Sequence, residues 1–505
     1  MSHAGAAVLV AYFVTLGVLA VYGVHRLYLL HLYLGRPQGR RRPPGRLRPL
    51  PAITVQLPIY NEMYVVERLI RTVCALEYPP ERLEIQVLDD STDDTSRIAA
   101  AAVSQMRARG IDIVHLRRPG RAGFKAGALA FGMERARGEL LAVLDADFAP
   151  EPSFLLDLVD HFADPRVGLV QARWGHLNRD YSLLTRLQAI FLDGHFVIEH
   201  AARHRAGRFF NFNGTAGIWR RACIESAGGW QADTLTEDLD LSYRAQLKGW
   251  RFVYVADVVA PAELPADIDA FKSQQHRWTR GSVETGLKIL PVLLRCRLPA
   301  GVKSEAFLHL TNNGAYALMV LLALLIVPAM IIRHASGLHS LLLLDLPLFL
   351  LSTAPVSAFY LRSQRELGVR TGSTLARLPL LMALGIGLCL NNSRAILGAL
   401  LGRRSEFVRT PKHDLRGSRG EWRGKLYRGS RSRAVVLLEA LFALYFGGAT
   451  AHALSAGMYW SLPFLLLFLT GFLYTSLLSR IHPTRRRAAG ASRPPARGPA
   501  VPIRP

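Results

Sequence analysis

Cysteine is scarce in this chain of 505 residues, which contains four. Their positions show none of the paired spacings that mark zinc sites or disulfide frameworks, so the sequence gives no support to either architecture. We expect the four thiols, Cys74, Cys223, Cys296 and Cys389, to be small buried hydrophobic groups.

Acidic residues are also few: the chain has 38 Asp and Glu but 62 Lys and Arg, which gives a formal net charge of +24. Such an excess can indicate a nucleic-acid-binding protein, but here the arginines cluster beside apolar runs. In that position basic residues orient a membrane protein and attract anionic lipid. We therefore predict a lipid bilayer as a partner and no nucleic acid.

Long apolar runs are what the sequence has in abundance, and hydrophobic residues make up 50% of it. Residues 5–25 hold no Asp, Glu, Lys or Arg and are long enough to cross a bilayer core of about 30 Å at about 1.5 Å per residue. A cleaved signal peptide is the alternative, but the run lacks a basic start and meets Arg26 and Arg36 directly afterwards. Five further apolar runs cover residues 311–332, 341–361, 376–400, 434–456 and 459–479.

The distribution of arginine predicts the membrane topology, since short basic loops stay on the cytoplasmic side. Residues 36–50 and 403–433 are both strongly basic, which places the long soluble region and the later loop in the cytoplasm. Six crossings would put the later loop outside, so we expect five. The run that we predict to lie in the interface or to re-enter is 376–400, which contains Arg377, Asn391, Asn392 and Arg394.

These features divide the chain into four parts. The long soluble region is bounded by apolar runs on both sides, and the chain closes with a basic tail that we expect to be disordered. The parts are an N-terminal transmembrane helix in 1–35, the soluble domain in 36–285, interfacial and transmembrane helices with the basic loop in 286–480, and the tail in 481–505.

The soluble region alternates strand-like and helix-like segments, which predicts an α/β domain on a mainly parallel sheet. Residues 65–77 and 95–109 fit helices between the first strands. The segments expected to form strands are "AITVQLPIYNE", "LEIQVLDDSTDD", "IDIVHLRR", "ELLAVLDADF" and "VGLVQARW".

Pairs of carboxylates follow two of these strands. Asp89 and Asp90 end the second strand, and Asp145 and Asp147 end the fourth. Ligands of such sheets bind beyond the carboxyl ends of the strands, where Mg²⁺ or Mn²⁺ is held by one or two carboxylates together with substrate phosphates. An exposed turn is the alternative for an Asp-x-Asp sequence taken alone.

Three further stretches carry candidate site residues, each with an ordinary structural alternative. Lys125 lies among glycines and alanines before a helix, where it could meet an anion or remain a solvated loop residue. Thr236 and Asp238 open a helix, where an acidic residue can also serve only the helix dipole. The third stretch places Gln274, Arg277 and Trp278 at helical spacing, as an amphipathic surface helix also does.

Taken in order, the motifs D, DxD, TED and QxxRW resemble those of the family 2 glycosyltransferases of the cellulose synthase superfamily. The segments "GFKAGAL", "DADFAPEPSFL", "FNFNGTAGIWR" and "QQHRW" are most similar to the cellulose synthase-like A branch, the β-mannan and glucomannan synthases. The resemblance covers roughly residues 50–285 and continues more loosely through 405–412. It implies a cytoplasmic GT-A domain, Rossmann-like, attached to an α-helical transmembrane region.

The resemblance also implies a donor and metal site. Asp89 and Asp90 would bind the nucleoside of a sugar nucleotide, with Lys125 near its base or diphosphate. Asp145 and Asp147 would hold the donor and a Mg²⁺ or Mn²⁺ ion, with Asp147 as the likelier direct ligand of the metal.

By the same resemblance, Asp238 would be the general base of a single inverting displacement, taking the proton of the acceptor hydroxyl. Arg277 would face the diphosphate, to which a guanidinium can bind through two donors. Gln274 would contact the acceptor, and Trp278 would stack against its terminal sugar.

The remaining implied residues lie in two motifs. Asn213 and Thr215 of "FNGTAG" would hydrogen-bond acceptor hydroxyls. Thr410 and Lys412 of "FVRTPK" would touch the donor from a segment that closes over it and excludes water. Arg409 stands where the cellulose synthases have valine, and "TRGSVET" after the tryptophan also departs from the plant mannan synthases.

Three hypotheses of function follow from the sequence. The leading one, favoured by QxxRW and by the segment resembling a gating loop, is a processive synthase that extends a β-linked mannan or glucan and extrudes it, with a growing polysaccharide as acceptor. The resemblance implies GDP-mannose as its donor, with GDP-glucose and UDP-glucose as the alternatives. The second is a non-processive transferase that adds one sugar to a lipid or short acceptor. The third, a membrane scaffold with a degenerate domain, is disfavoured because all the catalytic acids are present.

Overall fold

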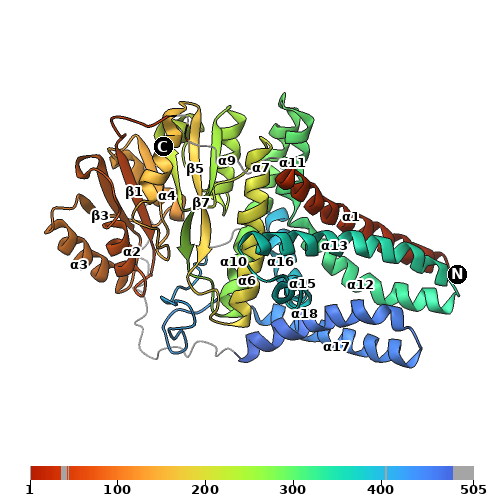
Figure 1. Cartoon of the computed structure of the whole chain (residues 1–505). Helices are drawn as coiled ribbons and strands as arrows, with labels where there is room; N and C mark the ends of the chain where they lie inside the picture. Colours follow the sequence, from red (N-terminus) through yellow and green to blue (C-terminus); the bar gives the residue numbers. More distant parts are fainter. Residues whose placement is uncertain (1, 36–42, 44, 404–406, 482–505) are drawn as a thin grey trace, which may run out of the picture.

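The computed structural model describes residues 2–35, 43, 45–403 and 407–481. A sheet-based domain occupies one side of the molecule, and long helices extend from it on the other (Figure 1). The tail 482–505, most of the basic stretch 36–44 and residues 404–406 of the basic loop lie outside the described residues, so the predictions made for them stay predictions.

A seven-stranded sheet of mixed direction forms the centre of the domain, in the order β3-β2-β1-β4-β6-β5-β7. Neighbouring strands are parallel except for β6, which runs antiparallel to both β4 and β5. The strands are β1 (Ile53–Ile59), β2 (Leu83–Asp89), β3 (Ile113–Arg117), β4 (Leu140–Val143), β5 (Val167–His176), β6 (Gly217–Arg220) and β7 (Arg251–Ala262).

Helices cover both faces of this sheet, as expected for parallel strands whose residues are buried on both sides. Along β4, Leu140 and Ala142 face one hydrophobic cluster, whereas Leu141 and Val143 face the other. The domain helices are α2 (Val66–Val73), α3 (Thr95–Arg107), α4 (Phe124–Arg135), α5 (Phe154–Val159), α6 (Leu183–Asp193), a π-helical turn (Gly194–Glu199), α7 (His200–Arg205), α8 (Arg221–Ser226), α9 (Glu237–Leu247), α10 (Ile268–Arg295) and α11 (Ala300–Thr311).

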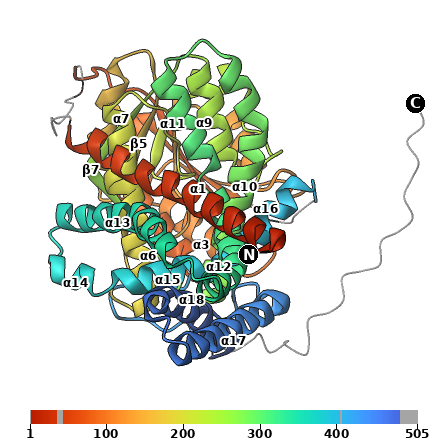
Figure 2. The same cartoon turned by 90° about the vertical axis from the view of Figure 1, so that its right-hand side faces the viewer.

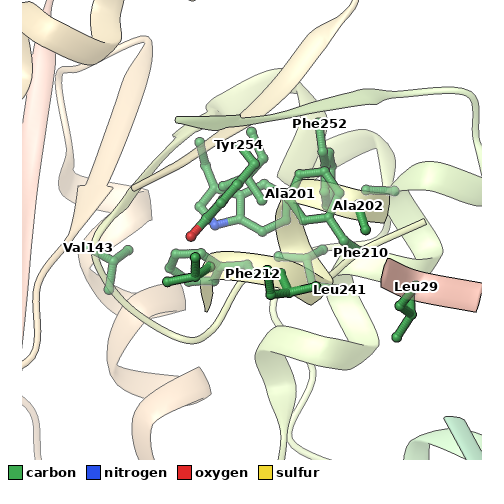
Figure 3. Packing of buried hydrophobic residues seen from close by; sticks show 14 of the residues in the cluster. Leu29, Val143, Ala201, Ala202, Phe210, Phe212, Leu241, Phe252 and Tyr254 are labelled. Atoms are coloured by element: carbon green, nitrogen blue, oxygen red, sulfur yellow. The ribbon is translucent and has the colours of Figure 1, made fainter. Parts of the chain in front are cut away.

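One hydrophobic cluster joins the sheet to the first long helix of the chain. Leu29 of α1 (His3–Leu34) belongs to the same cluster as Val143 of β4, Tyr254 of β7 and Phe210, which follows α7 (Figure 3). Leu29 is completely buried. The sheet is therefore packed, through a continuous cluster of buried side chains, against a helix that is apolar enough to span a membrane.

Among the described residues, six helical segments are long and apolar enough to cross a membrane, judged by length and composition. Helix α1 lies against α12 and α13, and α17 pairs with α18 (Figures 1 and 2). These segments are built from α1, α12 (Gly314–Ala335), α13 (Leu342–Glu366), α14 (Thr371–Leu375) with α15 (Leu378–Gly387) and α16 (Cys389–Leu400), α17 (Arg433–Ser455) and α18 (Leu462–Ile481).

The run 376–400, which we expected not to cross, is a broken helix. Its second half, α16, packs against α10, and its first half, α15, packs against α18. Asn391 is 6% exposed and donates a hydrogen bond to the Lys272 carbonyl oxygen (2.9 Å), so its polar side chain is satisfied inside the protein. Because length and composition also suit a crossing, the number of crossings stays a prediction.

The expected α/β class and the five expected strands are confirmed, and the two helices predicted after β1 and β2 are present. Two strands were missed. The antiparallel β6 has only four residues, whereas β7 was overlooked although its sequence, RFVYVADVVAPA, has the valines that are typical of a strand. All four cysteines are free thiols. Cys223 and Cys389 are buried, as expected, whereas Cys74 and Cys296 are only partly buried, so the expectation of four buried thiols is wrong for these two.

Candidate active site

A cleft lies beyond the carboxyl ends of β1, β2 and β4, and side chains from α9, α10 and the segment 407–412 complete its walls. Its position follows from strand register, because Ile59 pairs with Asp89 and Gln56 with Val143, so these strands end at one edge of the sheet. The predicted residues that line it are Asp90, Lys125, Asp145, Asp147, Asn213, Asp238, Gln274, Arg277, Trp278, Thr410 and Lys412.

Two predicted residues do not line the cleft. Asp89 is 2% exposed, and its carboxylate accepts hydrogen bonds from Ser96 (2.5 Å), the Ser91 backbone (2.8 Å) and His115 (2.9 Å). Burial alone would raise the pKa of Asp89, but these hydrogen bonds outweigh it and lower the pKa to about 2. The residue therefore supports the turn that carries Asp90.

The second of these residues is Thr215, which is fully buried. Its hydroxyl accepts a hydrogen bond from the backbone N–H of Asp145 (2.8 Å). Thr215 thus holds the backbone beneath Asp145, whereas its neighbour Asn213 reaches the cleft. The expected contacts of Asp89 with the sugar nucleotide and of Thr215 with the acceptor sugar therefore stay predictions.

Each of the three remaining strand-end carboxylates is paired with a cation. Arg118 binds Asp90 through two hydrogen bonds of 2.7 and 2.6 Å. Lys125 donates to Asp145 at 2.5 Å and also to the Gly214 carbonyl oxygen at 2.8 Å. These pairs concentrate alternating charge along the cleft, which suits a ligand that carries both phosphates and a cation.

Asp147 is held from two directions. Its Oδ2 accepts hydrogen bonds from Lys412 Nζ (2.7 Å) and from the Glu263 backbone N–H (3.0 Å), and its side chain is 7% exposed. Lys412 also donates to the Glu263 carbonyl oxygen at 2.5 Å. The segment that carries Lys412 is therefore closed down onto the DxD motif.

The carboxylates suit a divalent cation for which the protein would supply only some of the ligands. Asp145 and Asp147 each keep one carboxylate oxygen that accepts no hydrogen bond from the described residues. Within the described ranges no group of three or more His, Cys, Asp and Glu side chains is close enough to form a complete metal site. Mg²⁺ and Mn²⁺ are commonly bound by one or two carboxylates with substrate phosphates and water supplying the rest, which is the donor set present here.

Asp238 lies in the first turn of α9, where its Oδ1 accepts a hydrogen bond from the backbone N–H of Leu239 (2.8 Å). Burial, reinforced by the neighbouring Glu237, raises the pKa of Asp238 to about 7, and Lys125 acts in the opposite direction. A carboxyl with a pKa in this range can accept a proton at neutral pH, as a general base must.

Two glycines allow this close arrangement. A Cβ at Gly214, which has a φ of +81°, would lie 3.0 Å from Asp238 Oδ2 and 3.4 Å from Lys125 Nζ. A Cβ at Gly281 of α10 would lie 2.6 Å from the Thr236 side chain and 2.8 Å from its backbone nitrogen. Helix α10 can therefore approach the start of α9 closely enough to bring Trp278 and Asp238 to one cavity wall.

The segment 407–412 covers the cleft. Phe407 stacks on Phe124 with ring centroids 5.7 Å apart, and the Arg277 guanidinium lies 4.6 Å from the Phe407 ring centroid. Thr410 is 5% exposed and its hydroxyl has no hydrogen-bond partner among the described residues, although it lines the cleft. This orphaned hydroxyl is available to a ligand.

Sequence reasoning missed two ion pairs of the cleft. Arg118 directly follows β3 at the edge that carries Asp90, so the rule that identified Asp90 would also have found it. Arg409 binds Glu62 at 2.8 and 2.9 Å, and Glu62 lines the cleft while 9% exposed. Only the departure from the family pattern at Arg409 hinted at this pair.

A second cavity of about 350 Å³ opens beside the cleft and shares Trp174, Asn213, Asp238 and Trp278 with it. Its remaining walls come from α1, α6, the π-helical turn and α10 to α13. A third cavity of about 270 Å³ adjoins the second through a set of shared residues and is lined mainly by α1, α12, α13, α15 and α18. The shared residues are Arg26, Phe191, Asn312, Ala315, Met319, Tyr360 and Gly385.

Comparison with known proteins agrees with the motifs. Residues 51–281 match the family described as "Glycosyltransferase like family 2". The chain is 45% identical over 244 residues to a probable glucomannan 4-beta-mannosyltransferase 7 of Oryza sativa subsp. japonica, covering 47% of this chain and 42% of the relative. It is 43% identical over 250 residues to glucomannan 4-beta-mannosyltransferase 2 of Arabidopsis thaliana, covering 48% and 47%. The matches thus span about half the length of these relatives.

A solved structure supports the fold. The mannosyltransferase PcManGT from Pyrobaculum calidifontis, in complex with GDP-Man and Mn²⁺, matches with a TM-score of 0.52 and 20% identity, over 79% of this chain and all of that one. At this identity the likeness concerns the fold alone. The predicted resemblance and the GT-A fold class are confirmed.

Proposed function

We propose that the protein is a membrane-embedded, processive, inverting glycosyltransferase, on the premise that residues 51–281 match the family 2 glycosyltransferases. It uses a nucleotide sugar to extend a β-linked polysaccharide of the mannan or glucomannan type and passes the product into its membrane helices. The relatives named as glucomannan 4-beta-mannosyltransferases support this substrate class.

One observation carries the proposal. Asp238 and Trp278 line both the cleft that contains the DxD motif and the second cavity, which continues toward the membrane helices. A base at that junction can serve a donor on one side and an acceptor on the other. A transferase that adds one sugar to a short soluble acceptor has no need of the third cavity, whereas a polymer or a lipid acceptor could occupy it, so the length of the product decides between these two.

The residues of the cleft bind the donor in this scheme. Asp90, oriented by Arg118, contacts the nucleoside, while Lys125 and Arg277 face the diphosphate. Thr410 and Lys412 contact the donor from above, and the aromatic contact between Phe407 and Phe124 holds their segment closed. Closure excludes water that would otherwise hydrolyse the sugar.

A Mg²⁺ or Mn²⁺ ion fits the same site, with Asp147 and Asp145 as its protein ligands. When bound, such an ion neutralises charge on the leaving diphosphate as a Lewis acid. The solved neighbour was crystallised with GDP-Man and Mn²⁺, which makes GDP-mannose with Mn²⁺ the first pair to test.

The transfer is one displacement. The acceptor hydroxyl, held against Trp278 and Gln274, attacks the anomeric carbon while its proton passes to the Asp238 carboxylate. The bond between the anomeric carbon and the diphosphate oxygen breaks, and its electron pair leaves with the nucleoside diphosphate. Attack from the face opposite to the leaving group inverts the anomeric configuration and requires no covalent intermediate on the protein.

Orientation in the membrane is part of the proposal. The two basic stretches, residues 36–50 and 403–433, support a catalytic domain on the cytoplasmic side of the membrane. Donor supplied to inside-out vesicles should then be used without permeabilisation, whereas intact right-side-out vesicles should use it only after permeabilisation. Equal use by both preparations before permeabilisation would contradict the orientation.

The decisive experiment uses the purified full chain in lipid vesicles with Mn²⁺ or Mg²⁺. Labelled GDP-mannose, GDP-glucose and UDP-glucose are supplied separately, and products are digested with linkage-specific hydrolases. We expect a ladder of long products sensitive to a β-1,4-mannanase, which EDTA abolishes and added Mn²⁺ restores. A single glycolipid or a one-sugar product would refute processive synthesis.

A further inference from the structure

The side chain of Asn213 lies where the donor cleft and the second cavity meet, and both ends of its amide are held by histidines. His200 Nε2 lies 2.5 Å from Asn213 Oδ1, and Asn213 Nδ2 lies 3.0 Å from His195 Nε2. Its backbone N–H donates to Gln171 Oε1 at 3.2 Å. Few side chains in the cleft are fixed from so many directions.

The proton positions of this group follow from its contacts. His195 Nδ1 lies 2.8 Å from the Glu199 carboxylate and must therefore carry a proton, which leaves Nε2 as the acceptor for the Asn213 amide N–H. Asn213 Oδ1 then accepts from His200 Nε2, whose Nδ1 is buried without a partner and so needs no proton. Burial lowers the pKa of both histidines, to about 3 for His200, so both rings are neutral as this pattern requires.

The chain of contacts continues to the first membrane helix. Glu199 is ion-paired with Arg26 of α1 and lies 3.5 Å from Arg203. Glu199 and His195 both belong to the π-helical turn between α6 and α7, a local widening of the helix that brings the two side chains to the wall of the second cavity. Such single π-helical turns frequently occur at functional sites.

The arrangement leaves Asn213 with a defined hydrogen-bonding capacity. One of its two amide protons is used by His195, and one lone pair of Oδ1 is used by His200, so one donor and one acceptor remain. Asn213 is only partly buried and faces the cleft next to Asp238. With the amide orientation locked, the remaining donor and acceptor can meet an acceptor hydroxyl in one orientation only.

We propose that His195 and Glu199 are positioning residues which, through Asn213, orient the acceptor sugar toward Asp238, and that Arg26 makes the first membrane helix part of this arrangement. The inference rests on the proposed glycosyl transfer and extends it to residues that touch neither donor nor metal. Misplacing an attacking group by about 1 Å can reduce a rate by about 100-fold, so loss of this support should affect transfer far more than donor binding.

The test uses the purified full chain with GDP-mannose and Mn²⁺, and it compares transfer of mannose to polymer with hydrolysis to free mannose. His195→Ala should lower mannan formation at least about tenfold while the KM for GDP-mannose and the slow release of free mannose to water stay within about twofold of the wild type. Glu199→Gln should shift the ratio of polymer to free mannose in the same direction, and His195→Gln, which restores an acceptor for the Asn213 amide, should recover part of it.

His161→Ala is the matched control, because His161 is 7% exposed in the same domain and lines none of the three cavities. It should leave the ratio unchanged. If His195→Ala and Glu199→Gln kept the wild-type ratio, or if polymer formation and hydrolysis fell together as in a generally destabilised variant, the positioning role would be refuted. Wild-type protein that neither transfers nor hydrolyses mannose would instead refute the proposed function itself.

Discussion

Replacing Asp238 by asparagine removes a proton acceptor while disturbing little else. The hydrogen bond from the Leu239 backbone N–H to Asp238 Oδ1 can be kept by the asparagine carbonyl oxygen, and the side-chain volume is nearly unchanged. The substitution also removes a negative charge from a partly buried position next to Glu237, so we expect no loss of folding stability. What disappears is the group that, in the proposed reaction, takes the proton of the acceptor hydroxyl.

The expected size of the effect follows from the role. A positioned general base contributes a factor of about 10² to 10⁴, so Asp238→Asn should reduce kcat by that factor, equivalent to about 3 to 5 kcal/mol of transition-state stabilisation. Affinity for the nucleotide sugar should stay within about threefold, because within the described part of the chain no cationic side chain hydrogen-bonds to Asp238. The two cations near it donate elsewhere, Lys125 to Asp145 and Arg277 to the Val408 carbonyl oxygen.

The assay measures polymer formation from labelled GDP-mannose and, separately, binding of GDP with Mn²⁺ by titration calorimetry in detergent. Asp233→Asn is a suitable control, since Asp233 precedes α9 and forms an exposed ion pair with Lys288. Asp238→Asn protein that retained more than about a tenth of the wild-type kcat would refute the base assignment. Loss of nucleotide binding in the same variant would show that Asp238 belongs to the donor site instead.

Three further perturbations test other parts of the structure. Because burial raises the pKa of Asp238 and the base must be ionised, kcat should fall as the pH drops through about 7 and level off above it; a pH-independent kcat between 6 and 8 would contradict this. Arg118→Ala releases Asp90 and should raise the KM for the donor about tenfold with a smaller change in kcat, measured by initial rates. Glu439→Gln leaves the buried Lys272 without its carboxylate and should lower Tm, whereas a Lys272→Met, Glu439→Leu double variant should regain stability.

The parts of the site that follow strands could be predicted from the sequence. Asp90, Asp145 and Asp147 lie where the ends of parallel strands required them, because the register of β1 with β2 and β4 brings those ends to one edge. Asp89 shows the limit of this rule. Alternation along the strand turns it inward, where three hydrogen bonds hold it, and a pattern of residue types does not reveal which of two adjacent carboxylates faces the cleft.

The network around Asn213 could not be predicted in this way. Arg26, His195 and Glu199 come from two helices that are separated by more than half of the domain sequence, and none belongs to a recognised motif. Their meeting depends on how α1 packs against the π-helical turn and α13, which is a tertiary arrangement without a local sequence signal. The same holds for Gly281, whose need for a missing side chain is apparent only once α9 and α10 are seen to touch.

Helix α10 connects the cleft to two helices that are apolar enough to cross a membrane. At its start, Lys272 is buried in contact with Glu439 of α17 (2.7 Å) and Ser479 of α18 (2.9 Å), while two turns later Trp278 and Gly281 face the cleft and α9. Helix α10 is thus held in contact with α17 and α18 at one place and with the cleft at another. In the proposed reaction the position of the acceptor sugar would therefore depend on α17 and α18 as well as on the sheet, which links the carboxylates at the sheet edge to helices that are apolar enough to cross a membrane.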